Sequence, residues 1–373
     1  MRVSFIRGAY LNNFEGQNFD FTNQSDISFC GYSSLFPIDS NVPFPIVRLL
    51  SIADIQKIPL LNSPVRYISN RILGDSQILW GLENHIYSSD IVHIADPHYY
   101  YSYQAAVLKK KRVVKKLIST WWETIPFNNE GTSAKKYIKQ FVMNETDVFL
   151  CYTEKARDCL IQEGVDTQKI ATIPLGVDLN KFNLNKNEHN EFTVLFVGRL
   201  VVEKGVLDLY EVFKKIAKAN GKTVKLRLVG TGPLESKLKR LIEKDNLTKQ
   251  VTVESRSYRE MSEVYQQSDV LCVPSKKTSS WEEQYGMVFI EAMACGIPIV
   301  SYLTGAIPEI VKDCGFILNE GDREQMEKSL IRLRTDEKLC HKIGTMGRER
   351  AEEYFNARKT SKNIYNLYKS LAN

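Results

Sequence analysis

Glu283-Gln-Tyr-Gly286-Met-Val-Phe-Ile-Glu291-Ala-Met-Ala-Cys-Gly296-Ile-Pro298 is the stretch that decides the fold, because it places two carboxylates around a glycine that opens an apolar helix. The start of a helix offers unpaired N–H groups and about half a positive charge, which can hold a diphosphate. Because carboxylates repel phosphate, we expect Glu283 and Glu291 to face neutral hydroxyl groups, such as those of a sugar and a ribose. Each hydrogen bond to a charged acceptor contributes about 1.5–3 kcal/mol. The stretch therefore predicts a nucleotide-sugar site.

A purely structural interpretation fits the same stretch. Its apolar residues would form a buried helix in any α/β protein, and the two glutamates would then be surface residues. A short pattern does not separate these interpretations by itself. The rest of the chain has to decide between them.

Short apolar runs alternate with segments of helical period along the whole chain, which favours parallel sheets flanked by helices. The predicted strands of the first half are Val3–Ile6, Ile27–Cys30, Ile91–Ile94, Val113–Ile118, Val148–Cys151 and Ile170–Ile173. Those of the second half are Thr193–Val197, Val224–Val229, Val251–Val253, Val270–Val273, Pro298–Tyr302 and Phe316–Leu318. We expect each set to form one doubly wound sheet, with ligands bound beyond the carboxyl ends of the strands.

A polar, asparagine-rich segment separates the two sets of strands and is the predicted linker. The sequence thus predicts a first domain over residues 1–178, a linker over 179–190 and a second domain over 191–355. Two long helical stretches run from about Asp322 to the C-terminus, with a break near Phe355-Asn356. We expect residues 356–373 to form a C-terminal helix that packs back on the first domain.

Composition indicates a globular protein in a reducing compartment. The 373 residues are 43% hydrophobic and 25% charged, and the net charge of +6 is too modest to indicate nucleic acid. The chain has no run of some eighteen apolar residues, and charge interrupts its start too soon for a signal peptide, so we expect a cytoplasmic protein. The seven cysteines form no Cys-x-x-Cys pair and lie near no histidine cluster, so neither a disulfide framework nor a zinc site is indicated.

Two basic residues follow the first predicted strand of the second half, in Gly198-Arg199-Leu-Val-Val-Glu-Lys204-Gly205. Arginine can contact two phosphate oxygens at once, and lysine supplies a compact charge. As an isolated pair they would be surface charges, but beside a helix start that attracts an anion we expect them to bind a diphosphate. Gly230 ends the next strand and would let the backbone approach a ligand closely, although a simple strand-to-helix turn explains it as well. Thr304-Gly305 opens a further helix and either adds N–H groups to the same site or only caps that helix.

Taken together, these motifs resemble glycosyltransferase family 4, the large retaining group with the GT-B fold. The resemblance rests on Gly198-Arg199 with Lys204-Gly205, Gly230-Thr-Gly232, Pro274-Ser275, the paired glutamates, and Ile173-Pro-Leu-Gly176-Val-Asp178. It is strong over the second half of the chain and weak over the first. It implies an α/β protein with two Rossmann-like, doubly wound parallel-sheet domains facing across a cleft, the first for the acceptor and the second for the nucleotide sugar.

The resemblance also implies roles for individual residues. Arg199, Lys204 and Glu283 would be catalytic, because the two cations neutralise the leaving diphosphate and Glu283 holds hydroxyl groups of the donor sugar. The implied donor-binding residues are Gly16, Gly198, Gly230, Gly286, Met287, Val288 and Glu291, with Glu291 on the ribose. In this family protein cations and a helix dipole stabilise the diphosphate, so we expect no metal and no cofactor, which fits the absence of an Asp-x-Asp motif.

The first half departs from the family pattern in two places. Many members carry two adjacent glycines after the first strand, where this chain has Glu15-Gly16. Glu15 is unexpected near a diphosphate and could serve the acceptor instead. The family's histidine contact with the donor sugar cannot be carried over, because the expected segment contains none, and Glu123 or His98 could replace it. Trp122 could stack on a sugar or a lipid, or it could pack in the core.

A basic run, Lys109–Lys116, follows an aromatic segment. Such a run is either a solvated face or an attachment site for an anionic membrane, where each basic residue adds roughly 1 kcal/mol. We therefore expect a cytoplasmic retaining glycosyltransferase, in contact with the inner membrane face, that uses a UDP or GDP sugar and a glycan or lipid-linked acceptor. The alternatives are a GT-B nucleotide-sugar epimerase and a non-catalytic scaffold that binds a membrane or RNA.

Overall fold

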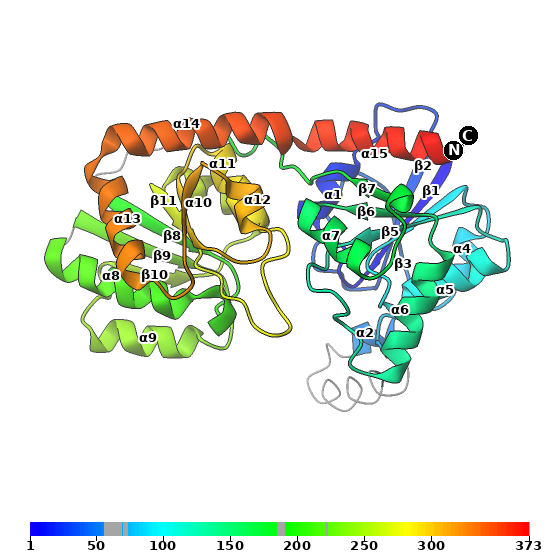
Figure 1. The fold of residues 1–373 in the computed structure, drawn as a ribbon, viewed down its shortest axis with the longest axis horizontal. Coiled ribbons are helices and arrows are strands. Elements are labelled where there is room, and N and C mark those ends of the chain that lie inside the picture. The colour runs from blue at the N-terminus through cyan, green and yellow to red at the C-terminus, as the bar shows by residue number, and fades with distance from the viewer. Residues whose placement is uncertain (56–68, 70–73, 185–190, 221–222, 373) are drawn as a thin grey trace. The chain divides into compact units, whose positions relative to one another are not determined.

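The computed structural model describes residues 1–55, 69, 74–184, 191–220 and 223–372, and the chain divides into two compact units (Figure 1). Unit 1 consists of Met1–Leu175 and Ala357–Asn373, and unit 2 of Gly176–Asn356. The sequence analysis placed these boundaries at 178, 190 and 355. Residues 185–190 of the predicted linker lie outside the described residues.

Unit 1 is built on a seven-stranded parallel sheet with the order β3-β2-β1-β4-β5-β6-β7. Its strands are β1 (Arg2–Gly8), β2 (Ser28–Ser33), β3 (Ile46–Arg48), β4 (Ile91–Ile94), β5 (Lys116–Trp121), β6 (Val148–Cys151) and β7 (Ile170–Thr172). Every strand predicted for this half is present, but β3 was missed because it has only three residues and none of them is fully buried. The prediction for β5 began too early, because Val113 is exposed and Arg112 adopts a positive φ of 60° in the preceding turn.

The helices of unit 1 begin where short polar side chains cap them. Thr132 and Thr153 accept hydrogen bonds from the first turns of α6 and α7, respectively. The helical elements are α1 (Asn13–Gly16), η1 (Gln17–Phe19), α2 (Ile52–Ile55), α4 (Leu82–Ile86), α5 (Tyr100–Lys110), α6 (Ser133–Glu145), α7 (Glu154–Gln162), η2 (Thr167–Lys169) and α15 (Ala357–Ala372). Strands β1 and β4 contribute to a common core with α4, α5 and α6.

Unit 2 contains a six-stranded parallel sheet with the order β10-β9-β8-β11-β12-β13. Its strands are β8 (Phe192–Val197), β9 (Val224–Val229), β10 (Val251–Glu254), β11 (Val270–Cys272), β12 (Ile299–Tyr302) and β13 (Gly315–Leu318). All of them were predicted from the sequence as short apolar runs, and the central residues of β8, β11 and β12 are buried. The strand order reverses between β8 and β11, which is the switch point where doubly wound sheets bind ligands.

Helices cover both faces of this sheet, with α8 and α9 on one side and α11 and α12 on the other (Figure 1). The helical elements of unit 2 are η3 (Val202–Lys204), α8 (Val206–Asn220), α9 (Glu235–Lys244), η5 (Tyr258–Glu260), α10 (Met261–Gln266), α11 (Met287–Ala294), α12 (Ile307–Val311), α13 (Arg323–Thr335) and α14 (Glu337–Tyr354). The sequence predicted one break after Asp322, near Phe355, and that break is present. A second break occurs at Asp336, whose side chain caps α14.

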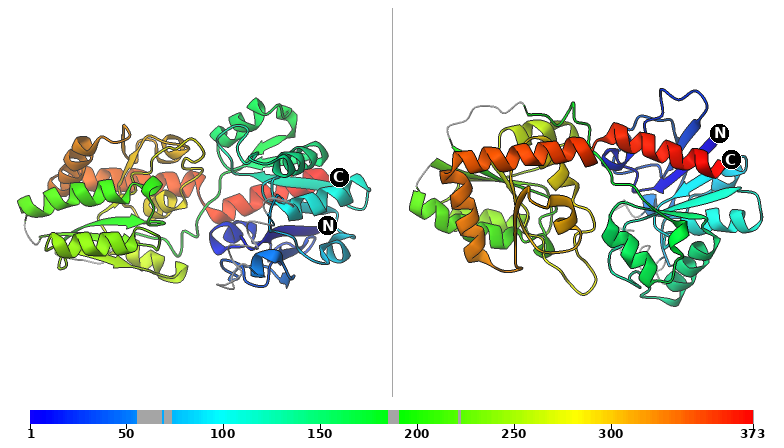
Figure 2. Two further views of the ribbon diagram at one scale, coloured as in Figure 1. Left: turned by 90° about the horizontal axis from the view of Figure 1, so that it is seen from below. Right: turned by 45° about the horizontal axis from the view of Figure 1, so that its top comes forward.

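The C-terminal helix α15 belongs to unit 1, although it follows unit 2 in the chain. Figure 2 shows it (red) beside the amino-terminal strands (blue). Tyr368 of this helix is fully buried, lies 6.4 Å from Phe29 between ring centroids, and forms a 2.7 Å hydrogen bond with His93. None of the described helices combines the length and apolar content that a membrane-spanning helix needs.

Candidate functional site

The predicted site residues of unit 2 follow the carboxyl ends of its strands. Gly198 and Lys204 come after β8, Gly230 after β9, and Glu283 lies in the loop between β11 and α11. Because all six strands are parallel, these loops lie at one edge of the sheet. The fold therefore gathers segments that are far apart in the chain.

Lys204 and Glu283 form a close ion pair at this edge. The Lys204 Nζ lies 2.6 Å from Glu283 Oε2, and Ser275 Oγ donates a 2.9 Å hydrogen bond to the same oxygen. The Glu283 side chain is only 8% exposed, and these two donors compensate for its burial. The Lys204 ammonium also lies 5.0 Å from the centre of the Trp281 ring. The structure thus brings together two of the three predicted catalytic residues.

Backbone contacts fix the position of Glu283. The Ala306 N–H donates a 2.8 Å hydrogen bond to the Glu283 carbonyl, and a Cβ at Gly305 would lie 1.9 Å from that carbonyl oxygen. Gly305, with φ +55°, is therefore required by close approach to the loop that carries Glu283. The sequence analysis considered two roles for Thr304-Gly305. The structure shows a different role, because this turn holds Glu283 in place.

Helix α11 begins at Met287, directly after Gly286. Gly286 caps the helix with φ +81°, and a Cβ there would lie 2.4 Å from the Phe289 ring. The N–H of Phe289 donates a hydrogen bond to the Gly286 carbonyl. The N–H groups of Met287 and Val288 are the first two of the helix. A Cβ built at Gly286 would also contact Glu283 Cγ at 3.5 Å, so the helix start and the Lys204–Glu283 pair are neighbours.

The third predicted catalytic residue, Arg199, is not drawn into this group. Its side chain is 60% exposed, and its Nη2 lies 3.6 Å from Glu203 Oε1. Gly230 has a structural explanation, because a Cβ there would lie 1.9 Å from the Gly198 carbonyl oxygen. The loops after β8 and β9 can approach each other this closely only with glycine at that position.

Glu291 lies in a different environment from Glu283. It is 3% exposed, and the Tyr265 hydroxyl donates a 2.7 Å hydrogen bond to its Oε2. Burial raises the pKa of the Glu291 carboxyl to about 7, against the opposing effects of the Tyr265 and Tyr258 side chains and Lys181. The sequence analysis missed Tyr265, because nothing in its local pattern distinguishes it from a core tyrosine.

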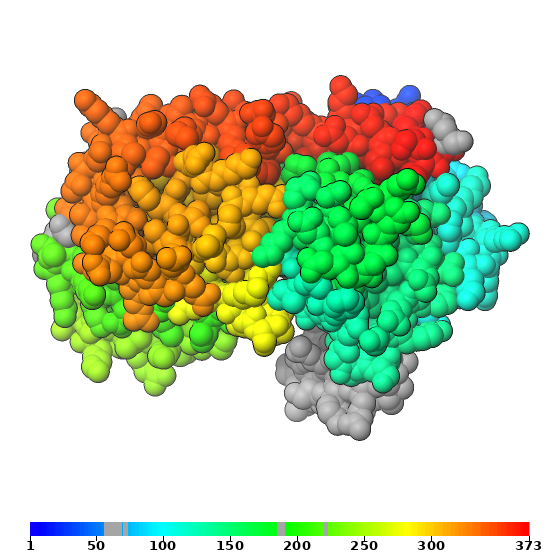
Figure 3. All heavy atoms as spheres, in the orientation of Figure 1, coloured from blue at the N-terminus to red at the C-terminus, as the bar shows by residue number. Residues whose placement is uncertain are grey.

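A second ionic cluster fastens the loop that carries Glu283. Lys276 Nζ lies 2.7 Å from Asp208 of α8, which also accepts hydrogen bonds from Arg323 and Tyr302. The Lys276 N–H donates a 2.7 Å bond to the Glu203 carbonyl. Residues 277–280 of this loop are exposed, and the segment forms part of the surface in Figure 3 (yellow). The base of the loop is thus anchored while its tip is open to solvent.

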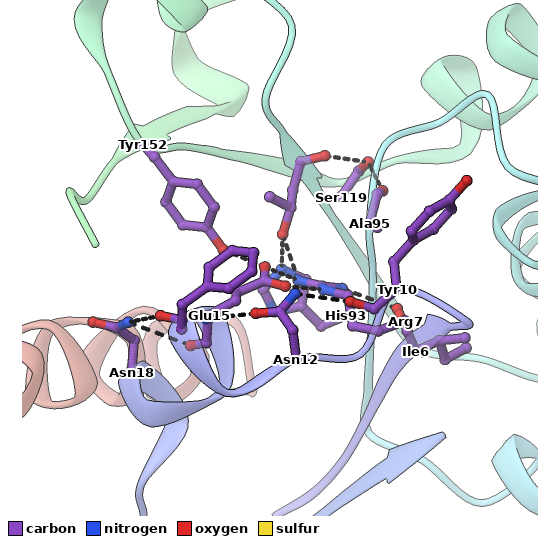
Figure 4. A network of polar contacts seen from close by, with 12 residues as sticks. Ile6, Arg7, Tyr10, Asn12, Glu15, Asn18, His93, Ala95, Ser119 and Tyr152 are labelled. Carbon is purple, nitrogen blue, oxygen red and sulfur yellow. Dashed lines mark hydrogen bonds and ion pairs between the residues drawn. The ribbon is translucent and has the colours of Figure 1, made fainter. Parts of the chain in front are cut away.

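In unit 1, Glu15 is part of a buried network with Arg7 (Figure 4). Arg7 Nε and Nη2 each donate a 2.9 Å hydrogen bond to the Glu15 carboxylate, and Tyr152 donates a third at 2.8 Å. Gly16 follows in α1, and a Cβ there would lie 2.5 Å from Val42 Cγ1. Both residues are buried against their own unit. Their roles toward an acceptor and a donor stay predictions.

Glu123 organises the loop after β5. Its carboxylate accepts hydrogen bonds from the N–H groups of Thr124 and Ile125 and from the side chains of Asn128 and Asn129, all between 2.9 and 3.1 Å. Four donors use most of the capacity of a carboxylate. This arrangement explains Glu123 without a ligand.

His98 and Trp122 have aromatic neighbours. The His98 ring centroid lies 4.3 Å from that of Tyr99, and Trp122 packs edge-on against Tyr152 at 4.5 Å. Desolvation, together with Lys135 and Lys139, lowers the pKa of His98 to about 3, so its imidazole is neutral at physiological pH. Both side chains are half-buried.

The basic run Lys109–Lys116 is divided among several partners. Lys109 pairs with Asp147 at 2.7 Å, and Lys115 pairs with Asp90 at 2.7 Å. Lys110, Lys111 and Arg112 are exposed at the end of α5. Among the described residues, no three His, Cys, Asp or Glu side chains are grouped as metal ligands would be.

Family comparisons cover most of the chain. The family model of the glycosyl transferases group 1 matches residues 178–350, and that of Glycosyltransferase Family 4 matches residues 44–181. The amylovoran biosynthesis glycosyltransferase AmsK of Erwinia amylovora is 28% identical over 244 residues, which are 64% of this chain and 59% of that protein. The putative colanic acid biosynthesis glycosyltransferase WcaL of Escherichia coli (strain K12) is 27% identical over 278 residues, 72% of this chain and 68% of that protein. The chain thus spans less than two thirds of the length of AmsK.

Solved structures resemble the whole chain. HepE of Anabaena in complex with UDP matches with a TM-score of 0.74 at 16% identity, over 99% of both chains. HepE in complex with UDP-glucose matches with a TM-score of 0.75 at 14% identity. Sucrose-phosphate synthase of Thermosynechococcus elongatus matches with a TM-score of 0.73 at 18% identity, over 99% of this chain and 98% of that chain. At these identities the likeness establishes the fold.

Proposed function

The chain belongs to glycosyltransferase family 4, the glycosyl transferases group 1, with the GT-B fold, and we propose that it transfers a sugar from a nucleoside-diphosphate sugar to a glycan or lipid-linked acceptor. The single observation that carries this proposal is the Lys204–Glu283 pair beside the start of α11. A cation and open N–H groups suit a diphosphate, and a carboxylate suits the sugar next to it.

Each residue of the site has a role in the proposed reaction. Lys204 and the N–H groups of Met287 and Val288 would stabilise the negative charge that develops on the leaving diphosphate. Glu283 would accept hydrogen bonds from the donor sugar, and Glu291 from the ribose. The Lys204–Glu283 contact keeps both side chains in position before the donor arrives, so less reorganisation is needed during reaction.

Arg199 supplies a second positive charge in this proposal. Its contact with Glu203 is long and solvent-exposed, and pairs of this kind contribute about 0–1 kcal/mol. Little free energy is therefore lost when Arg199 turns from Glu203 to a diphosphate. The protein cations and the helix start together would allow transfer without a metal, and we propose retention at the anomeric carbon from the family resemblance.

UDP and GDP both fit the proposed donor. The structural neighbour HepE was solved with UDP and with UDP-glucose, which supports UDP as the first nucleotide to test. For the acceptor, the exposed residues Lys110, Lys111 and Arg112 support contact with the anionic inner face of a membrane, where each would add roughly 1 kcal/mol. We propose a lipid-linked or polymeric acceptor used at this surface.

Nucleotide binding tests the proposal directly. A ligand at 100 times its dissociation constant raises the free energy of unfolding by about 2.7 kcal/mol, so UDP or GDP should raise the melting temperature. UDP-glucose and GDP-mannose are then incubated with and without an extract of membrane lipids and glycans. Transfer of the sugar only in the presence of the extract supports the transferase. An isomerised donor without any acceptor would identify an epimerase, and no response to either nucleotide would point to a scaffold.

A further inference from the structure

Asp96 is a buried carboxylate with few partners at the carboxyl end of β4. It is 7% exposed, and its Oδ1 accepts a 3.0 Å hydrogen bond from the N–H of Trp122, which follows the neighbouring strand β5. Within the described part of the chain, this is the one hydrogen bond that its side chain makes, and no cation pairs with it. The sequence analysis did not single out Asp96.

Two other buried carboxylates of unit 1, those of Glu15 and Glu123, have more hydrogen-bond partners. Glu15 accepts three hydrogen bonds from Arg7 and Tyr152, and Glu123 accepts four from its own loop. Buried charged groups in proteins are normally paired or fully hydrogen-bonded, because desolvation without compensation costs several kcal/mol. Asp96, with one side-chain hydrogen bond, therefore has more capacity left for a further donor than Glu15 or Glu123.

The charged and titratable groups around Asp96 shift the pKa of its carboxyl in opposite directions. Burial contributes most to raising the pKa of Asp96, and the carboxylates of Glu123 and Glu15 raise it further. The Trp122 N–H and Arg7 of β1 oppose them, and the result is a pKa of about 7. The charge of Asp96 contributes to raising the pKa of Tyr99 and Tyr101, at the start of α5, after the larger effect of burial, and the Tyr101 hydroxyl is buried without a hydrogen-bond partner among the described residues. In the part of unit 1 that the structure describes, no side chain donates a hydrogen bond to the Asp96 carboxylate.

Aromatic residues follow Asp96 in the chain, and Trp122 stands at the end of the neighbouring strand β5. Trp122, which donates to it, is half-buried. Tyr99 follows Asp96 in the chain, and its ring centroid lies 4.3 Å from that of His98 and 5.1 Å from that of Tyr10. Tyr10 is 43% exposed. A few polar groups among aromatic side chains is the usual composition of a small-molecule site.

We propose that Asp96 accepts a hydrogen bond from a sugar hydroxyl of the substrate. This inference rests on the proposed function and assigns to Asp96 the polar contact for which the sequence offered Glu123 and His98. Glu123 already accepts four hydrogen bonds, whereas the Asp96 side chain accepts one, so Asp96 has more capacity for a hydroxyl donor. The hydroxyl comes from the acceptor or from the donor sugar.

The test compares wild type with Asp96→Asn, which keeps the shape of the side chain and its acceptor for the Trp122 N–H. Dissociation constants are measured for UDP, for UDP-glucose, and for the methyl glycosides of glucose, galactose and mannose in the presence of UDP. We expect unchanged affinity for UDP and a loss of about tenfold or more for one sugar ligand, because a hydrogen bond to a charged acceptor is removed. A loss for UDP-glucose identifies the donor sugar as the source, and a loss for a glycoside identifies the acceptor.

The pH dependence separates this role from a structural one. Sugar affinity of wild type should fall from pH 8 to pH 6, as Asp96 is protonated, whereas that of Asp96→Asn should not change. Asp90→Asn is the matched control, because Asp90 precedes the same strand at the opposite edge of the sheet, and its affinities should equal those of wild type. Equal losses for UDP and the sugars, or no loss at all, would overturn the inference. If wild type binds no nucleoside diphosphate, the proposed function fails first and this inference fails with it.

Discussion

Glu283 and Glu291 belong to one stretch of sequence, but the side chains that contact them give them different chemistry. Glu283 is paired with the Lys204 cation and Ser275, whereas Glu291 is bonded to the neutral phenol of Tyr265 in a more buried position. The spacing of the two glutamates in the sequence therefore does not indicate that their environments differ. At the residue scale, each can be tested by removing its partner or its charge.

Lys204→Met should lower kcat by about 10²–10³, because it removes a positive charge from the proposed leaving diphosphate. It also leaves the buried Glu283 without its cation, so the melting temperature should fall as well. Initial rates with the donor that wild type uses, together with thermal unfolding, measure both effects. Lys328→Met is the matched control, since Lys328 is an exposed lysine paired only with Glu324 on α13. Full activity of the Lys204 variant would contradict its role.

Glu291→Gln should stabilise the protein above neutral pH while weakening donor binding. The folded-state pKa of Glu291 is raised to about 7 from 4.5, so folding is favoured while the carboxyl is protonated. The contribution of the protonated Glu291 carboxyl to the free energy of unfolding is complete below pH 4.5. It is lost as pH rises through 7, which lowers the free energy of unfolding by about 1–3 kcal/mol. The difference in unfolding free energy between variant and wild type should thus grow from pH 5 to pH 8.5 in urea titrations. Glu324→Gln, on the surface of α13, should show no such trend, and a flat difference for Glu291→Gln would refute the assignment.

At the scale of elements, the loop before α11 is positioned by its neighbours on both sides. Lys276 ties it to α8 through Asp208, and the turn before α12 holds the Glu283 backbone through Gly305 and Ala306. The site is therefore built from tight contacts between loops. Its glycines are required by backbone distances, which can be tested one position at a time.

Gly305→Ala should destabilise unit 2 by about 2–5 kcal/mol, from a strained positive φ and from overlap with the Glu283 carbonyl. Activity should fall with it, because Glu283 must move. Gly321→Ala has a similar φ of +84° but no atom within 4 Å of the new Cβ, so only the backbone strain of about 1–2 kcal/mol applies. Urea unfolding of both variants isolates the effect of the contact. Equal losses would show that Gly305 serves the turn alone.

At the scale of the whole molecule, the C-terminal helix α15 packs against residues from the amino-terminal part of the chain and completes unit 1. Tyr368 packs against Phe21 and Phe29 and bonds to His93, which in turn bonds to Thr120 of β5 at 2.8 Å. Unit 1 is thus incomplete until the residues of α15 have been synthesised. Its stability depends on a helix encoded after unit 2.

Tyr368→Phe should cost about 1 kcal/mol, because it removes the hydrogen bond to His93 but keeps the ring. Tyr368→Ala should cost about 3–5 kcal/mol, because it leaves a cavity between α15 and the sheet. Tyr365→Phe, which removes an exposed hydroxyl bonded to Asp26, should change stability by less than about 0.5 kcal/mol. Chemical unfolding of the three variants gives the series. A Tyr368→Ala variant as stable as wild type would mean that α15 does not support unit 1.

Alternating apolar and polar segments were enough to predict the strands and the α/β fold, because buried parallel strands are short apolar runs wherever they occur. The order of the motifs from Gly198 to Pro298 likewise predicted the family, which the family comparisons confirmed. Strand β3 escaped prediction because three half-exposed residues carry too little of this signal.

The identity of each partner was decided by the tertiary structure. Glu291 pairs with Tyr265, and Glu15 pairs with Arg7. Arg199 lies at the surface, and the Asp96 carboxylate accepts a single hydrogen bond. All four outcomes depend on which loops meet at the ends of the strands. Spacing along a chain records which residues share an element. The distances between side chains on different elements, and hence their charges and hydrogen bonds, are fixed only when the sheets and helices have packed.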